Sequence, residues 1–413
     1  MNPEDAERYL LSLELFGMRF GLDRMRRLMT ALGHPERAFR SVHVVGTNGK
    51  SSTTRMIAAI LAQHGLRTGA YLSPHLVSFG ERIRIDNHDL PPAEFGAAVG
   101  RAAHAADLVN RSLDADDQVT QFEALTAAAY SELARAQVEV AVIEAGLGGR
   151  YDATNVIPSS VQVLTSVGLE HTRWLGPTIT DIAEEKLAVV QDGATLVLGA
   201  GLDPVVVAVA ERVCAEHGAR LVQAETDPGV AVGAAGTFQR RNFALARTAA
   251  EAFLGELEPS AVAAAAAEVR VPGRLQQIGS DPLTYIDGAH NPDGMRALAE
   301  SLPELIAGHE RVVATVSILD DKDAAAMLAT LIGACDALVF TSSQNPRALP
   351  PPTLQSLTRQ LHGPSSEVVG DPRSALHRAR ELAGPRGLVI ATGSLYLIAD
   401  LLAAGPREQA SIL

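Results

Sequence analysis

Residues 41–54, with the sequence SVHVVGTNGKSSTT, restrict the possible folds of this chain more than any other stretch. The β-branched run at 42–45 predicts a buried strand, the glycines after it predict a turn, and a helical pattern begins after Lys50. Such a turn directs backbone N–H groups at an anion, and Lys50 adds a cation. The stretch therefore predicts a phosphate-binding loop. The residues expected to contact phosphate or its magnesium ion are Thr47, Asn48, Gly49, Lys50, Ser51 and Ser52.

An ordinary strand-to-helix turn with a surface lysine is the alternative interpretation of this stretch. The strict nucleotide-binding pattern has a glycine where Val44 stands, so the generic motif is not met. The hexamer GTNGKS nevertheless resembles the phosphate loop of the Mur ligase and folylpolyglutamate synthase superfamily. The folate branch of that superfamily usually has glycine after the lysine, where this chain has Ser51.

The length of the chain predicts more than one domain, because 413 residues exceed a single typical core. The pair Pro272-Gly273 breaks a helical pattern and gives predicted domains of residues 1–270 and 271–413. The net charge of −13 argues against a nucleic-acid-binding surface. Cys214 and Cys335 lie far apart, so a structural disulfide is not expected.

Membrane association is not expected, since no apolar run approaches the ~20 residues of a membrane span. The acidic start, MNPEDAERYL, lacks the apolar core of a signal peptide, which favours the cytoplasm. We expect a cytoplasmic monomer whose partners are small molecules.

Polar residues follow two further predicted strands. Pro74 stops a strand and leaves Ser73 at its carboxyl end, and the apolar run at 138–143 ends in Glu144. Ligand groups gather at this edge of an open α/β sheet, and a carboxylate there is well placed to hold Mg²⁺ directly or through water. The SPHL…ERI segment that begins at Ser73 resembles one in the family whose serine binds magnesium.

The string EAGLGGRYDATN at 144–155 has two interpretations from the residues alone, a flexible glycine turn or a weak dinucleotide fingerprint. It resembles the second diagnostic segment of the folylpolyglutamate synthase family, with Ala145 and Tyr151 as departures. The resemblance implies substrate contacts by Tyr151, Asp152 and Ala153, and by Thr120 in the family's TxFE segment. Helix capping by Thr120 and Glu123 explains the TQFE sequence equally well.

The predicted metal site is completed by His171 and Lys186, which both follow the strand at 161–167 in the sequence. His171 aligns with the family's ligand for a second magnesium ion, although a lone histidine after a strand is more often a satisfied polar group, and Glu170 replaces the usual aspartate. Lys186 lies among apolar residues in a predicted helix. It resembles the family's lysine that takes up CO₂, and the carbamate would be a further magnesium ligand. An exposed helical lysine is the alternative.

The N-terminal segment predicts two helices within residues 4–32, separated by the loop MRFGLDR. The loop resembles a pterin-contacting segment of the family, but we interpret Arg19 and Arg24 as surface charges. Residues 86–117 are polar and acidic, and they predict a mobile surface connection followed by a helix.

Beyond residue 270, five predicted strands alternate with helices and indicate a second, mostly parallel sheet. The expected fold class is therefore α/β, with an N-terminal ATP-binding domain of phosphate-loop type and a smaller Rossmann-like domain. The DGAHNP segment at 287–292 resembles the family's third diagnostic segment. The resemblance assigns nucleotide contacts to Asn242, Arg274 and Asp287, and a position facing the cleft to His290.

Together these segments imply an ATP-dependent ligase that joins L-glutamate to a folate or to dihydropteroate through an acyl phosphate, with two Mg²⁺ ions. Its catalytic residues would be Lys50, Glu144, His171 and Lys186, and its metal ligands Ser73, Glu144, His171 and Lys186. Three alternatives stay open: a Mur-ligase-like enzyme for another carboxylate acceptor, a phosphate-loop kinase or NTPase, and a nucleotide-binding module without catalysis.

Overall fold

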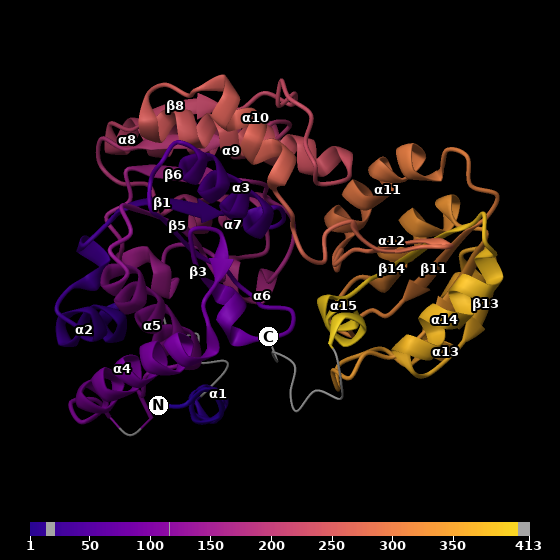
Figure 1. Cartoon of the computed structure of the whole chain (residues 1–413), viewed down its shortest axis with the longest axis horizontal. Coiled ribbons are helices and arrows are strands. Elements are labelled where there is room, and N and C mark those ends of the chain that lie inside the picture. Colours follow the sequence, from indigo (N-terminus) through magenta and orange to yellow (C-terminus); the bar gives the residue numbers. More distant parts are fainter. Residues whose placement is uncertain (14–20, 115, 404–413) are drawn as a thin grey trace. The chain divides into compact units, whose positions relative to one another are not determined.

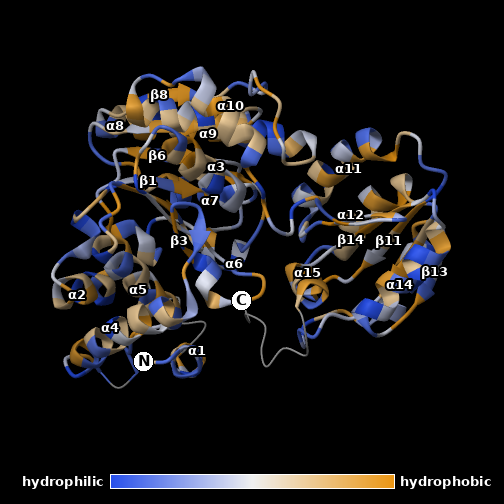
Figure 2. Ribbon diagram, viewed as in Figure 1, coloured by the Kyte–Doolittle hydropathy of each residue, from blue (hydrophilic) through white to orange (hydrophobic). Residues whose placement is uncertain are grey.

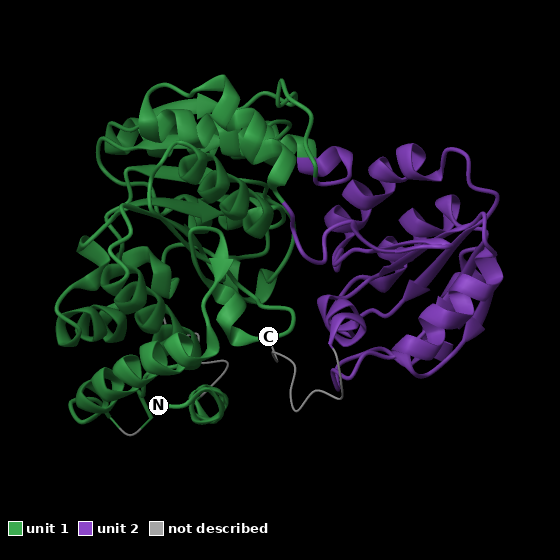
Figure 3. Cartoon of the chain, in the orientation of Figure 1, with its two compact units in different colours: residues 1–233, 240–269, 413 green, residues 234–239, 270–412 purple. Residues whose placement is uncertain are grey.

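The computed structural model describes residues 1–13, 21–114 and 116–403. The chain divides into two compact units (Figure 3). Of the described residues, unit 1 comprises 1–233 and 240–269 apart from the gaps given above, and unit 2 comprises 234–239 and 270–403. Arg19, in the predicted pterin-contacting loop, lies outside the described residues.

Unit 1 is built on one sheet of eight strands in the order β4-β3-β2-β5-β1-β6-β7-β8 (Figure 1). All neighbours are parallel except β2 with β3 and β3 with β4, which are antiparallel. Because β1 and β5 run side by side, their carboxyl ends lie at the same edge. The strands are β1 (Arg40–Val45), β2 (Thr68–Tyr71), β3 (Ile83–Ile85), β4 (His88–Asp89), β5 (Val140–Glu144), β6 (Val161–Leu164), β7 (Thr195–Leu198) and β8 (Arg220–Gln223).

The helices of unit 1 bury apolar faces against this sheet and against one another. The one that follows β1 begins at Lys50, next to the predicted start of the helical pattern, and the left-handed Gly65 follows its C-terminal end. The helices are α1 (Pro3–Ser12), α2 (Asp23–Ala31), α3 (Lys50–Gln63), α4 (Pro92–Asn110), α5 (Gln121–Arg135), α6 (Thr172–Leu175), α7 (Ile179–Leu187), α8 (Pro204–His217), α9 (Thr237–Leu254), of which residues 240–254 belong here, and α10 (Pro259–Glu268). Short 3-10 turns are η1 (Pro35–Arg37), η2 (Phe79–Arg82) and η3 (Ala153–Val156).

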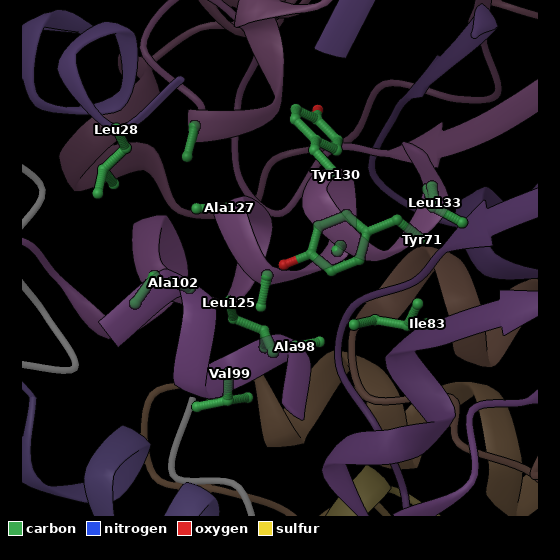
Figure 4. Close-up of a cluster of buried hydrophobic side chains, with 14 of the residues drawn as sticks. Leu28, Tyr71, Ile83, Ala98, Val99, Ala102, Leu125, Ala127, Tyr130 and Leu133 are labelled. Atoms are coloured by element: carbon green, nitrogen blue, oxygen red, sulfur yellow. The ribbon is translucent and has the colours of Figure 1, made fainter. Parts of the chain in front are cut away.

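The largest core cluster of unit 1 joins β2, β5, α4 and α5 (Figure 4). Tyr71 and Tyr130 are fully buried in it, and alanines along α4 and α5 let these helices approach closely. Each buried Leu or Val contributes roughly 1.5–3 kcal/mol relative to exposure. Figure 2 shows apolar residues concentrated on the strands, with polar residues on the outward faces of the helices.

Unit 2 has one six-stranded sheet in the order β13-β12-β11-β14-β10-β9. Only the pair β9–β10 is antiparallel. The strands are β9 (Gln276–Ser280), β10 (Leu283–Ile286), β11 (Val312–Val316), β12 (Ala337–Phe340), β13 (Ser365–Val368) and β14 (Leu388–Thr392). The helices are α11 (Pro292–Ile306), α12 (Ala324–Leu331), η4 (Ile332–Ala334), α13 (Pro351–Gln360), α14 (Pro372–Ala383) and α15 (Leu395–Leu402).

The α/β fold class with two mainly parallel sheets is confirmed, and two details differ from the prediction. Unit 2 has a sixth strand, β9, whose sequence QQIGS carries too few apolar residues to show a strand pattern. The helix predicted within the polar segment at 86–117 is present as the 19-residue α4, but the predicted surface connection before it is the turn and second strand of the β3–β4 hairpin. None of the helices in the described parts of the chain is long and apolar enough to cross a membrane.

The sequence predicted that Arg24 is a surface charge, and this prediction is wrong. Arg24 is a buried member of an ion pair. Its guanidinium Nε lies 3.1 Å from both carboxylate oxygens of Glu123, and Nη1 lies 2.5 Å from Asp117. Only 7% of Arg24 is exposed. Glu123 in turn accepts the backbone N–H of Thr120 at 2.9 Å, so the predicted capping box is present and Arg24 is attached to it.

Replacing Arg24 with leucine should destabilise unit 1 by about 3–5 kcal/mol, because Glu123 would keep a buried charge without its cation. Arg8→Ala is the matched control: its pair with Asp5 is 75% and 47% exposed, so its loss should cost less than about 0.5 kcal/mol. Chemical denaturation of the two variants measures the difference. Equal free energies of unfolding would contradict a stabilising role for the buried pair.

Candidate active site

The loop after β1 is held by hydroxyl and carbonyl groups at the end of β6. Thr47 donates its N–H to the Ser166 carbonyl at 2.8 Å, and Asn48 donates its N–H to Ser166 Oγ at 2.9 Å. Thr165 Oγ1 donates to the Asn48 carbonyl at 2.6 Å, and a Cβ at Gly46 would overlap Thr165 Oγ1. Sequence reasoning missed Thr165 and Ser166, because hydroxyls after a strand are common and carry no motif.

Gly49 ends the loop in the left-handed region with φ +86° and caps α3. A Cβ at Gly49 would lie 2.8 Å from Asn242 Oδ1, so the α9 side chain is packed against the loop. Asn242 was expected to contact the nucleotide, and the structure brings it to the predicted phosphate loop.

Gly49→Ala should weaken ATP binding at least ~10-fold, since both the backbone conformation and Asn242 oppose a methyl group there. Gly65→Ala is a matched control: it also has a positive φ, +83°, but nothing lies within 4 Å of its Cβ. We expect both variants to lose stability through backbone strain, Gly49→Ala the more because of Asn242, and only Gly49→Ala to lose affinity in a nucleotide titration. Parallel loss of affinity in the two variants would contradict the assignment of the loop.

Glu144, at the carboxyl end of β5, is buried beside the loop with 1% exposure. Its Oε1 accepts the Ser51 hydroxyl at 2.8 Å, and its Oε2 accepts the Ser73 N–H at 3.1 Å. Ser51 of α3 and Ser73, after β2, therefore meet at Glu144 of β5. All three were predicted from the sequence as metal-site or phosphate-loop residues. Arg82, also buried, donates to Ser73 Oγ at 3.4 Å and to His75 Nδ1 at 2.9 Å, which fixes this segment.

Lys186 is buried, not exposed, with 4% of its surface accessible. Its Nζ donates to the Gly46 carbonyl at 2.9 Å, so α7 is attached to the start of the phosphate loop. Burial, with a smaller contribution from the nearby Lys50 charge, lowers the pKa of Lys186 to about 7. A substantial share of this amine is therefore neutral and nucleophilic near neutral pH. Lys50 itself donates to the Thr47 carbonyl at 3.2 Å.

The glycine segment after β5 lies against α7. A Cβ at Gly149 would lie 2.6 Å from the Lys186 carbonyl, and one at Gly146 would lie 2.6 Å from the Phe122 ring. Asp152 closes the segment by accepting the Leu147 N–H at 2.8 Å, and burial raises the pKa of its carboxyl. Of the predicted substrate residues in this segment, Asp152 and Ala153 are buried, whereas Tyr151 is 43% exposed.

His171 is exposed and lies in the left-handed region, φ 53°, at the N-cap of α6. The segment that carries it is joined to the phosphate loop, because Thr47 Oγ1 accepts the Gly168 N–H at 3.0 Å. The Glu170 charge raises the pKa of Lys186 against the larger effect of burial, which places Glu170 within electrostatic range of that amine.

In unit 2 Asp287 and His290 lie in the turn after β10, and Arg274, which precedes β9, lies against that turn at Gly288. Asp287 accepts the Leu275 N–H at 2.9 Å and the Ala289 N–H at 2.8 Å, so both oxygens brace the turn, and burial raises its pKa. Arg274 Nη1 donates to the Gly273 carbonyl at 3.1 Å. His290 Nδ1 lies 2.8 Å from the Gly288 carbonyl.

The donors around Glu144 suit magnesium, a cation that prefers oxygen ligands and keeps several waters. The Ser51 hydroxyl lies 2.8 Å from the Glu144 carboxylate, and Ser73, whose backbone N–H contacts the same carboxylate, carries a second hydroxyl that accepts from Arg82. In the described ranges no three His, Cys, Asp or Glu side chains gather as a metal cluster. One carboxylate with hydroxyls and phosphate oxygens is the usual environment of nucleotide-bound Mg²⁺, so these residues fit the ion.

The fold and this site define a Mur-ligase-type protein. Residues 44–200 match the Mur ligase middle domain, and residues 273–395 match the Mur ligase glutamate ligase domain. The dihydrofolate synthase/folylpolyglutamate synthase of Bacillus subtilis is 31% identical, over 96% of this chain and 98% of that protein. The folylpolyglutamate synthase of Mycobacterium tuberculosis, solved in complex with ADP, superposes with a TM-score of 0.89 and 32% identity, covering 98% and 99% of the two chains.

The chain spans about half the length of a longer relative, the probable bifunctional folylpolyglutamate synthase/dihydropteroate synthase of Haloferax volcanii, to which it is 33% identical over 97% of its own residues. The chain belongs to the folylpolyglutamate synthase/dihydrofolate synthase family of the Mur ligase superfamily.

Proposed function

We propose that this protein is an ATP-dependent ligase that joins the amine of L-glutamate to the carboxylate of a folate or of dihydropteroate. The observation that carries the proposal is the meeting of Ser51, Ser73 and Glu144 beside a glycine loop that ends in Lys50. Membership of the family, whose B. subtilis relative is named for both activities, supports the choice of substrates.

The first step transfers the γ-phosphoryl group of ATP to the acceptor carboxylate, because phosphorylation turns a carboxylate oxygen into a good leaving group. Lys50 and the loop N–H groups neutralise and orient the triphosphate, and the positive end of α3 adds to their field. Ser51, Ser73 and Glu144 would hold a magnesium ion, which would supply charge neutralisation on the phosphate oxygens. His171 and Lys186 are proposed as ligands of a second ion.

Lys186 is proposed to react with CO₂ and to carry a carbamate. Its burial and its pKa of about 7 support this, since CO₂ reacts only with the neutral amine. The carbamate would be an anion where the free amine would be a cation, and so would favour a second Mg²⁺.

The amine of glutamate then attacks the acyl carbon and phosphate leaves. We propose that residues 271–413 bind glutamate, in agreement with the match of residues 273–395 to a glutamate ligase domain. Asn242, Arg274 and Asp287 are proposed nucleotide contacts. Thr120, Tyr151, Asp152, Ala153 and His290 are proposed substrate contacts.

A parallel assay tests the acceptor. Purified protein is incubated with ATP, Mg²⁺ and labelled glutamate, against dihydropteroate in one arm and tetrahydrofolate in the other. Labelled product in at least one arm is expected. Labelled product in neither arm, with product from another carboxylic acid, would favour the alternative of a Mur-ligase-like enzyme for a different acceptor.

A further inference from the structure

His43 is a buried polar residue in the strand that leads into the phosphate loop, three residues before Gly46. It is fully inaccessible, and the mechanism above gives it no role. Burying a polar ring costs free energy unless its nitrogens are hydrogen-bonded. Its Nε2 lies 2.9 Å from the hydroxyl of Thr154, in η3, 111 residues along the chain.

The hydroxyl of Thr154 connects His43 to Asp152. Thr154 Oγ1 donates to Asp152 Oδ1 in a short hydrogen bond, and the Thr154 N–H donates to the same oxygen at 3.0 Å. The other oxygen, Oδ2, accepts the Leu147 N–H at 2.8 Å. Tyr130 holds the same turn from α5 by donating to the Thr154 carbonyl at 2.9 Å. His43 and Thr154 are fully buried, and Asp152 is 6% exposed.

The number of protons fixes the direction of this chain of hydrogen bonds. A hydroxyl has one proton, and Thr154 uses it toward Asp152, so the hydroxyl oxygen can only accept from His43. His43 must therefore carry its proton on Nε2. Its Nδ1 has no hydrogen-bond partner in the described part of the chain, so a proton on Nδ1 would be a buried donor without an acceptor, and burial lowers the pKa of His43 to about 3.

We infer that His43 is a positioning residue that sets the distance between the phosphate loop and the acceptor-side segment 146–152. The inference rests on the proposed function. One strand, β1, carries the phosphate loop at its end and reaches Asp152 through Thr154, and Asp152 closes the segment on the Leu147 N–H. The phosphoryl donor and the acceptor carboxylate are thereby aligned by one chain of hydrogen bonds.

His43→Leu removes the N–H donor, and His43→Gln is the conservative variant because its side-chain amide can donate from near the Nε2 position. With the better of dihydropteroate and tetrahydrofolate, His43→Leu should lower kcat/KM for the acceptor about 100-fold, as expected for a displacement of about 1 Å. The dissociation constant of ATP should change less than about threefold. It is measured by the fluorescence of Trp174, the only tryptophan, in α6. His43→Gln should recover most of the lost activity.

Thr154→Val tests the connection through the hydroxyl. The double variant His43→Leu/Thr154→Val should be no more impaired than the worse single variant, since both remove the same connection. The inference would be overturned if the losses of kcat/KM in the two single variants added up in the double variant. It would also be overturned if His43→Leu weakened ATP binding as much as it lowered kcat/KM for the acceptor, or if His43→Gln recovered no activity.

Nitrogen-15 NMR of the histidine-labelled wild-type protein provides a readout that does not depend on turnover. His43 should remain the neutral Nε2–H tautomer from pH 5 to pH 8, and its signal should be assigned by its disappearance in His43→Gln. An Nδ1–H tautomer or an imidazolium in this range would overturn the inference even in a protein with no measurable ligase activity. A wild-type protein that adds glutamate to neither acceptor would instead refute the proposed function, leaving the NMR result to decide the His43 contact.

Discussion

Lys50→Ala is expected to abolish ATP-dependent glutamate addition, with turnover at least ~10³-fold below wild type. Lys50 is the cation at the start of α3, directly after the glycine turn, and phosphoryl transfer depends on charge neutralisation at this point. Initial rates of labelled glutamate incorporation at saturating ATP measure the loss.

The fold should survive this substitution, because the described contact of Lys50 Nζ is a hydrogen bond to the Thr47 carbonyl. Thermal unfolding should therefore change by no more than a few degrees, on the order of 1 kcal/mol or less. Lys322→Ala, which removes a lysine of unit 2 paired with Asp321, is a control for the loss of one positive charge. Normal turnover by Lys50→Ala would contradict the assignment of the loop before Lys50 as the phosphate-binding loop.

Lys186→Ala is expected to be nearly inactive, and added acetate or propionate should restore part of its activity. Removing the amine removes the carbamate, and a small carboxylate can take its place in the space left by the side chain. Rates with and without added carboxylate, in Lys186→Ala and in wild type, measure the rescue. Full activity of Lys186→Ala without any addition would show that the lysine is peripheral.

The carbamate itself should be visible by carbon-13 NMR in labelled bicarbonate. Because the pKa of Lys186 is lowered to about 7, the neutral amine fraction rises from pH 6 to pH 8, and the signal should rise with it. The chain has only three lysines, Lys50, Lys186 and Lys322, so assignment is direct. The signal should vanish in Lys186→Ala and persist in Lys322→Ala. A signal that persists in Lys186→Ala would contradict carbamylation at this position.

Features that depend on local pattern were predictable from the sequence. The glycine turn between β1 and α3 and the carboxylate at the end of β5 follow from apolar runs and from the rule that parallel strands end at one edge. The strand order then brings Glu144 to Ser51, although 93 residues separate them.

Features that depend on pairing between distant polar residues were not predictable. Arg24 looks like a surface charge because its ion-pair partner, Glu123, lies 99 residues away and has a sufficient local role as a capping residue. The apolar residues around Lys186 in the sequence left an exposed helical lysine open as the alternative, since its burial depends on the phosphate loop 140 residues earlier. The connection from His43 to Asp152 was missed for the same reason.

The most direct test of the central claim follows oxygen from the acceptor to phosphate. The acceptor carboxylate is labelled with oxygen-18, and the phosphate released during ATP- and glutamate-dependent turnover is analysed by mass spectrometry. If the carboxylate is activated as an acyl phosphate, one phosphate should be released for each amide formed, and each phosphate should contain one oxygen-18 atom. Unlabelled phosphate would contradict the account, because water would then have accepted the phosphoryl group, as in a simple NTPase.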